Sequence, residues 1–293
     1  KIPNMFRRLT AEGALVQSFL PAYTLLEEKK SVKEAGILAE KVQTTLILSL
    51  LLILLLTEIF MSYFIFILAP GFKDNFLKYN MAVEYARYTM PYLPMVSIVA
   101  LWGSIAQASG RFVPLASAPI LLNISLISGS VLILSGICQP MILAIMVPIA
   151  GLFQIIFVGT WLFKIGRLPS FKLRRSSKAS KNVWKKFIPA ALGAGLLQIN
   201  LLVDTILATL LGDGAVSYLY YADRVAQLPL GIIGIALGTA LLPALSKLEA
   251  KKDIASIKTE IANSLKYGTI FSIPACLAFI VLSPLITEVF SML

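Results

Sequence analysis

Residues 112–163 read FVPLASAPILLNISLISGSVLILSGICQPMILAIMVPIAGLFQIIFVGTWLF, without a single charged side chain. A transmembrane helix needs about 20 consecutive, mostly apolar residues, so this run is too long to cross a bilayer once. Gly136, Gln139 and Pro140 lie near its middle and mark a turn, because Gly and Pro interrupt regular structure. The stretch therefore predicts two membrane-spanning helices joined by a tight turn.

Similar apolar runs lie on both sides of this pair. The whole chain is 58% hydrophobic and only 14% charged, whereas soluble domains average about 45–50% and 25%. The runs are too long for strands, so the sequence predicts an all-α, polytopic transmembrane helix bundle. The predicted helices or helix pieces cover residues 9–26, 42–68, 88–109, 114–136, 141–163, 187–211, 216–246 and 268–287.

Basic residues gather in every second linker between these helices. Linkers 27–41, 164–186 and 247–258 are rich in Lys and Arg, whereas those at 137–140 and 212–215 have none. Cytoplasmic loops of membrane proteins carry an excess of Lys and Arg, so the basic linkers are predicted to face the cytoplasm. Membrane topology and anionic lipid headgroups thus explain the net charge of +11, and no nucleic-acid partner is expected.

The largest basic linker divides the predicted helices into two groups. We expect N-terminal lobe helices at 1–163, the linker at 164–186, and the start of a C-terminal lobe at 187–293. The chain begins without Met and ends in an apolar run, so we expect a piece of a longer protein, truncated at both ends.

Several charged residues fall within the predicted spans, where each costs about 2.5–3.5 kcal/mol on insertion scales. At 1.5 Å per residue, Arg7, Arg8 and Arg224 lie roughly 28–34 Å from the nearest basic linker, at the outer side of the membrane. One interpretation is that the arginines snorkel to headgroups and that Asp223 and Arg224 form a helix cap and an anchor. The other is a ligand site, because the planar guanidinium donates two parallel hydrogen bonds to a phosphate. For the set of arginines we favour a phosphate or diphosphate ligand.

Other polar groups in the spans have weaker implications. Glu12 lies four residues after Arg8 and can pair with it on one helix face. Asp204 is a candidate partner of Arg224 or a candidate cation ligand. The uncharged polar residues are more often interhelical hydrogen-bonding groups than ligands, and they are Asn123, Gln154, Gln198 and Asn200.

Enzymatic signatures are missing from the sequence. The chain contains no histidine, which excludes histidine-based acid–base chemistry and histidine-ligated metal sites. It also lacks a Walker loop, paired carboxylates at useful spacing and a nucleophile with a base. We therefore expect neither an enzyme nor an ATP-driven pump.

Three stretches resemble the MurJ (MviN) family of lipid II flippases. The first is PNMFRRLTAEGA at 3–14, followed by QSFLP, and it resembles the Pro-Asn-x-x-Arg-Arg-x-x-Ala-Glu-Gly-Ala motif of the family's second helix. The second is ASAPILLNIS at 116–125, which is similar to the segment that opens the fifth helix. The third is YYADR at 220–224, with LPLG at 228–231 and ALGTALLPALS at 236–246, and it is similar to the eighth helix.

The resemblance implies a fold and an activity. Members have two lobes and fourteen helices, of which this sequence would supply helices two to nine. They translocate lipid II, the undecaprenyl-diphosphate-linked peptidoglycan precursor, across the bacterial inner membrane by alternating access. The implied partners are lipid II, the phospholipid bilayer and other proteins of cell-wall synthesis.

The resemblance also implies a site. Arg7, Arg8, Glu12 and Arg224 would line the central cavity, with the arginines on the diphosphate, while Asp223, Asn123, Gln198 and Asn200 are expected as supporting polar groups. Asp204 falls where some members carry an acid linked to a sodium site. No cofactor is expected apart from sodium or another coupling ion.

Two alternatives stay open at this point. One is a related flippase or exporter, for an O-antigen type of glycan or for drugs, although a hydrophobic cation would avoid arginines. The other is a non-transporting membrane scaffold that recruits cell-wall enzymes. A scaffold predicts that Arg7 and Arg224 tolerate replacement by alanine.

Overall fold

The computed structural model describes residues 14–172, 176–212, 214–229 and 253–291, and a few single residues between 231 and 248. The elements formed by these residues are all helices, with no strand among them. The chain forms two compact units, unit 1 (Lys1–Leu210) and unit 2 (Leu211–Leu293). The predicted all-α class is therefore confirmed.

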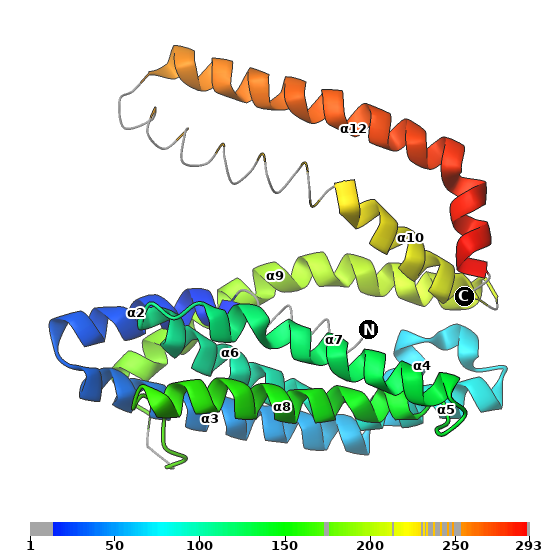
Figure 1. Cartoon of the computed structure of the whole chain (residues 1–293). Coiled ribbons are helices and arrows are strands. Elements are labelled where there is room, and N and C mark those ends of the chain that lie inside the picture. Colours follow the sequence, from blue (N-terminus) through cyan, green and yellow to red (C-terminus); the bar gives the residue numbers. More distant parts are fainter. Residues whose placement is uncertain are drawn as a thin grey trace. The chain divides into compact units, whose positions relative to one another are not determined.

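Most of the described helices belong to unit 1 (Figure 1). They are α2 (Leu15–Lys29), α3 (Val32–Ile59), α4 (Met61–Leu68), the short 3-10 helix η2 (Pro70–Phe72), α5 (Phe76–Thr89), α6 (Tyr92–Ala108), α7 (Val113–Leu134), α8 (Ile142–Lys164) and α9 (Lys178–Leu210). Unit 2 contributes α10 (Ala215–Pro229) and α12 (Ile254–Ser291).

Six of the described helical stretches are long and apolar enough to cross a bilayer. They are Val32–Ile59, Phe76–Ala108, Val113–Leu134, Ile142–Lys164, Lys178–Leu210 and Ile254–Leu285. Leu51, Leu52 and Leu55 of α3 are among their exposed side chains, as expected for a surface that faces lipid. The predicted spans at 9–26 and 216–246 lie partly outside the described residues.

Helix α6 is the central helix of unit 1. Most of its side chains are buried, and it packs against α2, α3, α7 and α8. Phe19 of α2, Leu46 of α3 and Leu162 of α8 belong to the same buried cluster. Lipid tails are as apolar as these side chains, so close packing and interhelical hydrogen bonds, more than hydrophobic burial, stabilise such a core.

The turn inside the uncharged stretch is a glycine-terminated helix end. Gly136 follows α7 with a φ of 72°, a left-handed conformation that glycine adopts without steric cost. The Ile137 amide donates to the Leu132 carbonyl at 3.1 Å, and the Gly136 amide donates to that of Ile133 at 2.9 Å. This arrangement closes α7 as a Schellman motif does and confirms the predicted turn.

The predicted linker at 27–41 is wrong in extent. Helix α2 continues to Lys29 and α3 already begins at Val32. The Ser31 hydroxyl accepts a hydrogen bond from the Glu34 amide at 3.2 Å and so caps α3. Lys and Glu are good helix formers, so a helix can extend well beyond the apolar segment that hydropathy detects.

The predictions for the next segments need a similar correction. The single span at 42–68 is divided at Phe60 into α3 and α4. The linker at 69–87 contains η2 and most of α5. Hydropathy misses the break at Phe60 because both sides of it are apolar, and it misses α5 because that helix is partly polar.

The second half of the predicted linker at 164–186 is also helical. Helix α9 begins at Lys178 and packs on α2 and α3, and Val183 near its start is buried in the core of unit 1. The division of the chain into two lobes at this linker stays a prediction.

Helix α12 of unit 2 begins with a capping carboxylate. Asp253 accepts hydrogen bonds from the Ser256 hydroxyl at 2.7 Å and from the Ser256 amide at 3.1 Å. These bonds favour the ionised form and hold the pKa of the Asp253 carboxyl below its usual range. A charged side chain therefore caps the start of this long helix.

Candidate functional site

The predicted site residues divide into those that the structure describes and those that it does not. Arg7, Arg8 and Glu12 lie outside the described residues, so their part of the site stays a prediction. The described candidates are Arg224 and Asp223 on α10, Asp204, Gln198 and Asn200 on α9, and Asn123 on α7.

Arg224 lies against an aromatic side chain in the second half of α10. Its side chain is exposed, and its Cζ atom lies 5.0 Å from the centroid of the Tyr220 ring, one helical turn earlier. The Tyr220 and Tyr221 rings lie edge to face with centroids 6.0 Å apart. A guanidinium over an aromatic face is attracted by the ring quadrupole, and its planar fork of N–H donors is suited to a phosphate.

Asp223 interacts with Gln227, one turn further along α10. Gln227 Nε2 donates a hydrogen bond to the half-buried Asp223 carboxylate at 2.7 Å. Helix α10 begins at Ala215, so Asp223 lies in its interior and the interpretation of this residue as a helix cap is wrong.

The polar residues of α9 lie on neighbouring turns. Asn200 and Asp204 are exposed and four residues apart, which places them on one face of the helix, whereas Gln198 is half-buried. No three His, Cys, Asp or Glu side chains within the described ranges lie close enough together to hold a metal ion. Asp204 belongs to unit 1 and Arg224 to unit 2, so their pairing stays a prediction, as does sodium binding at Asp204.

Of the two amides predicted in uncharged spans, one forms the expected interhelical bonds. Gln154 of α8 is buried, donates through Nε2 to the Ala118 carbonyl of α7 at 2.7 Å, and accepts from the Tyr92 hydroxyl of α6 at 3.3 Å. It therefore links three helices, which confirms its structural role. Asn123 of α7 is exposed, and its role as a supporting polar group stays a prediction.

Several interactions at the linker end of unit 1 were not predicted. Arg167 Nη1 lies 2.6 Å from Glu27 Oε1, and both side chains are only 20% exposed. In the same region the Ser170 hydroxyl donates to the Glu40 carboxylate. The partners are more than a hundred residues apart in sequence, so neither spacing nor periodicity points to them. For Arg167 and Glu27, the sequence offered only opposite charges near the ends of two predicted spans as a sign of pairing.

A second unpredicted set joins the linker to the centre of the core. Trp102 of α6 donates through Nε1 to Gln43 Oε1 of α3 at 2.7 Å. The Trp102 ring also contacts Phe171 of the linker, edge to face, with centroids 6.0 Å apart. The first part of the basic linker is therefore attached to unit 1.

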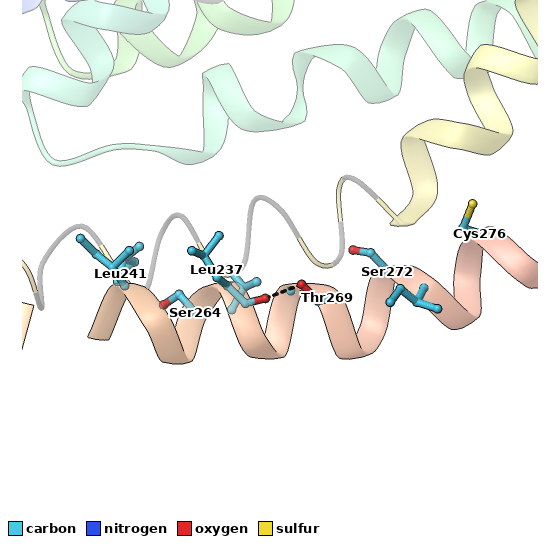
Figure 2. A pocket seen from close by; sticks show the side chains of 10 residues that line it. Leu237, Leu241, Ser264, Thr269, Ser272 and Cys276 are labelled. Atoms are coloured by element: carbon cyan, nitrogen blue, oxygen red, sulfur yellow. Dashed lines mark hydrogen bonds between the residues drawn. The ribbon is translucent and has the colours of Figure 1, made fainter. Parts of the chain in front are cut away.

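An open apolar groove of ≈ 600 Å³ lies in unit 2, between Leu237 and Leu241 on one side and α12 on the other (Figure 2). Cys276 marks one end of it in this view. The Thr269 hydroxyl in the groove donates to the Leu265 carbonyl of its own helix at 2.8 Å. None of the described lining residues is charged, so the groove offers no cationic group for a phosphate.

Comparison with known proteins gives consistent matches. The family model described as lipid II flippase MurJ matches residues 1–292. A probable lipid II flippase MurJ of Rickettsia prowazekii is 35% identical over 291 residues, which cover 99% of this chain and 57% of that protein. A lipid II flippase MurJ of Burkholderia cenocepacia is 30% identical over 297 residues, which cover 99% of this chain and 58% of that protein. The chain thus spans little more than half the length of these curated relatives.

Solved structures give the same fold. An inward closed conformation of lipid II flippase MurJ matches with a TM-score of 0.78 and 24% identity, over 96% of this chain and 57% of that one. An inward-facing multidrug resistance transporter of the MATE family matches with a TM-score of 0.74 and 15% identity, over 98% of this chain and 65% of that one. At these identities the structural matches establish the helical transporter fold only.

Proposed function

The chain belongs to the MurJ family of lipid II flippases, and from this premise we propose that the full-length protein moves lipid II from the cytoplasmic to the outer leaflet of the bacterial inner membrane. The match of the family model over residues 1–292 is the observation that carries the proposal. The six apolar stretches of membrane-spanning length among the described helices agree with a multi-pass membrane protein. We propose a transport role without a catalytic one.

The proposed substrate contact is a clamp of arginines on the diphosphate. Arg224 supports this role because it is exposed and lies over the Tyr220 ring, and because the neighbouring Asp223 interacts with Gln227. Arg7 and Arg8 would complete the clamp from the N-terminal lobe, and Glu12 would line the cavity beside them. Charge-assisted bonds from planar guanidinium groups are the strongest non-metal contacts available to a diphosphate.

The proposed transport cycle is alternating access. The headgroup enters a cationic cavity from the cytoplasmic leaflet while the lipid tail stays in the bilayer, and the two lobes then rock so that the cavity opens outward. A coupling ion or the membrane potential would drive the cycle, since the potential supplies about 2.3 kcal/mol per charge per 100 mV. Asp204 is the proposed ligand if that ion is sodium.

Lipid II translocation by the purified full-length protein in proteoliposomes tests this function. We expect the wild-type protein to expose lipid II to an impermeant probe in the opposite leaflet. Arg7→Ala and Arg224→Ala should each reduce the rate at least about tenfold, the effect of losing a charged hydrogen bond. Arg111→Ala is the matched control, because this arginine is exposed in the turn between α6 and α7.

The outcomes separate the candidate functions. If the wild-type protein does not move lipid II but moves another polyprenyl-diphosphate-linked glycan, the proposed substrate is wrong and the proposed mechanism still holds. A protein that moves no lipid-linked glycan would contradict the transport function. Full activity of both arginine variants would remove the clamp from the mechanism.

A further inference from the structure

We propose that Tyr220 is a positioning residue that holds the Arg224 guanidinium in the orientation needed to bind the diphosphate. The inference rests on the proposed function, because it assigns a new residue to the same site. It starts from the position of Arg224 Cζ over the Tyr220 ring, 5.0 Å from the ring centroid.

The geometry of the pair matches the demands of diphosphate binding. Tyr220 and Arg224 are four residues apart on α10, so their side chains lie on the same face of the helix. An aromatic ring against a guanidinium restricts a long, flexible side chain without neutralising its charge or removing its N–H donors. A long arginine that is already ordered loses less conformational entropy when its ligand arrives.

The second pair on α10 keeps the arginine available. Asp223 directly precedes Arg224 on α10, and adjacent helical side chains point in different directions. Its carboxylate accepts the hydrogen bond from Gln227 Nε2 at 2.7 Å. The Arg224 side chain is therefore oriented by an aromatic ring and not by a carboxylate. A carboxylate would neutralise the positive charge of the guanidinium, whereas the ring leaves it in place.

The same helix offers a control aromatic residue. Tyr218 is exposed to 58% and lies six residues before Arg224, which is not a spacing at which helical side chains meet. Replacing Tyr218 therefore changes aromatic content and helix propensity as replacing Tyr220 does, without removing the ring under the arginine.

A double-mutant cycle tests the assignment in the full-length protein in detergent, with undecaprenyl diphosphate as the probe ligand. We expect Tyr220→Leu to weaken binding about three- to tenfold, the range of a cation–π contact. Tyr220→Phe, which keeps the ring face, and Tyr218→Leu should bind within about twofold of wild type. In an Arg224→Ala background, Tyr220→Leu should cause no further loss, because the residue it positions is gone.

Any other result would overturn the positioning role of Tyr220, and each one identifies a different cause. Wild-type affinity of Tyr220→Leu, or an equal loss with and without Arg224, would show that the ring acts independently of the arginine. Weak binding by Tyr220→Phe would assign the effect to the hydroxyl group. Wild-type affinity of Arg224→Ala would contradict the proposed clamp, and the positioning role would fail with it. Melting temperatures of all variants distinguish these effects from misfolding.

Discussion

At the scale of single residues, buried amides connect the helices of unit 1. Gln43 binds Trp102 across α3 and α6, and Gln154 binds Ala118 and Tyr92 across α8, α7 and α6. The sequence predicted that Gln154 would bond between helices, because an amide in a fully apolar span has little else to bind. It could not predict the partners, since these depend on how the helices pack.

Replacing one of these amides tests its contribution. We expect Gln154→Leu to destabilise the full-length protein by about 0.6–1.7 kcal/mol, between the average and the maximum measured for interhelical hydrogen bonds in a membrane protein. Thermal unfolding in detergent measures the effect. Gln139→Leu is the control because Gln139 is exposed in the turn after α7, and equal melting temperatures for both variants would argue against the role of Gln154.

The candidate site likewise contains residues that the sequence predicted and contacts that it did not. Charges within a predicted span, and then the family resemblance, identified Arg224 and Asp223, but not their neighbours. Tyr220 and Gln227 lie four residues before Arg224 and four after Asp223, so helical spacing alone was sufficient to propose both contacts. The ion pair of Arg167 with Glu27 offered no such spacing and needed the tertiary structure.

At the scale of elements, the end of α9 packs tightly on η2. The Gly71 amide donates to the Thr209 hydroxyl at 3.2 Å, and a Cβ atom at Gly71 would overlap the backbone carbonyl of Thr209. Thr209 is itself buried. A side chain at position 71 therefore requires α9 and η2 to separate.

The prediction at this scale concerns Gly71→Ala. We expect it to lower stability by about 1–3 kcal/mol, as overpacking does in well-packed sites. Gly36→Ala in α3 is the matched control, because a Cβ atom there meets nothing within 4 Å and alanine favours a helix by up to about 1 kcal/mol. Thermal unfolding compares the two variants. If Gly71→Ala is as stable as wild type, α9 and η2 can separate without a loss of stability, which would contradict the prediction.

At the scale of the whole molecule, apolar segments and alternating basic linkers predicted the class of fold and an orientation in the membrane. Long apolar runs predict spans well because the bilayer imposes a minimum length. Element boundaries were less accurate, as at 27–41, because charged residues continue helices beyond the apolar core of a span. The orientation itself follows from charge alone and is open to direct test.

Cysteine labelling of the full-length protein in intact cells tests the orientation. Cys138 and Cys276 are first replaced by serine, and a single cysteine is then placed at Gln139 or Lys172. A membrane-impermeant maleimide should label position 139 from outside and position 172 only after permeabilisation. The reverse pattern would invert the predicted topology and place the arginines at the cytoplasmic side.

The central claim is that the arginines act on lipid II in the living cell. The most direct test is complementation of a bacterium depleted of its own lipid II flippase by the full-length protein, with Arg7→Ala, Arg224→Ala and the control Arg111→Ala compared at equal membrane levels. We predict that wild type and Arg111→Ala restore growth and that both site variants fail. Full rescue by Arg7→Ala and Arg224→Ala would contradict the claim and identify these arginines as membrane anchors.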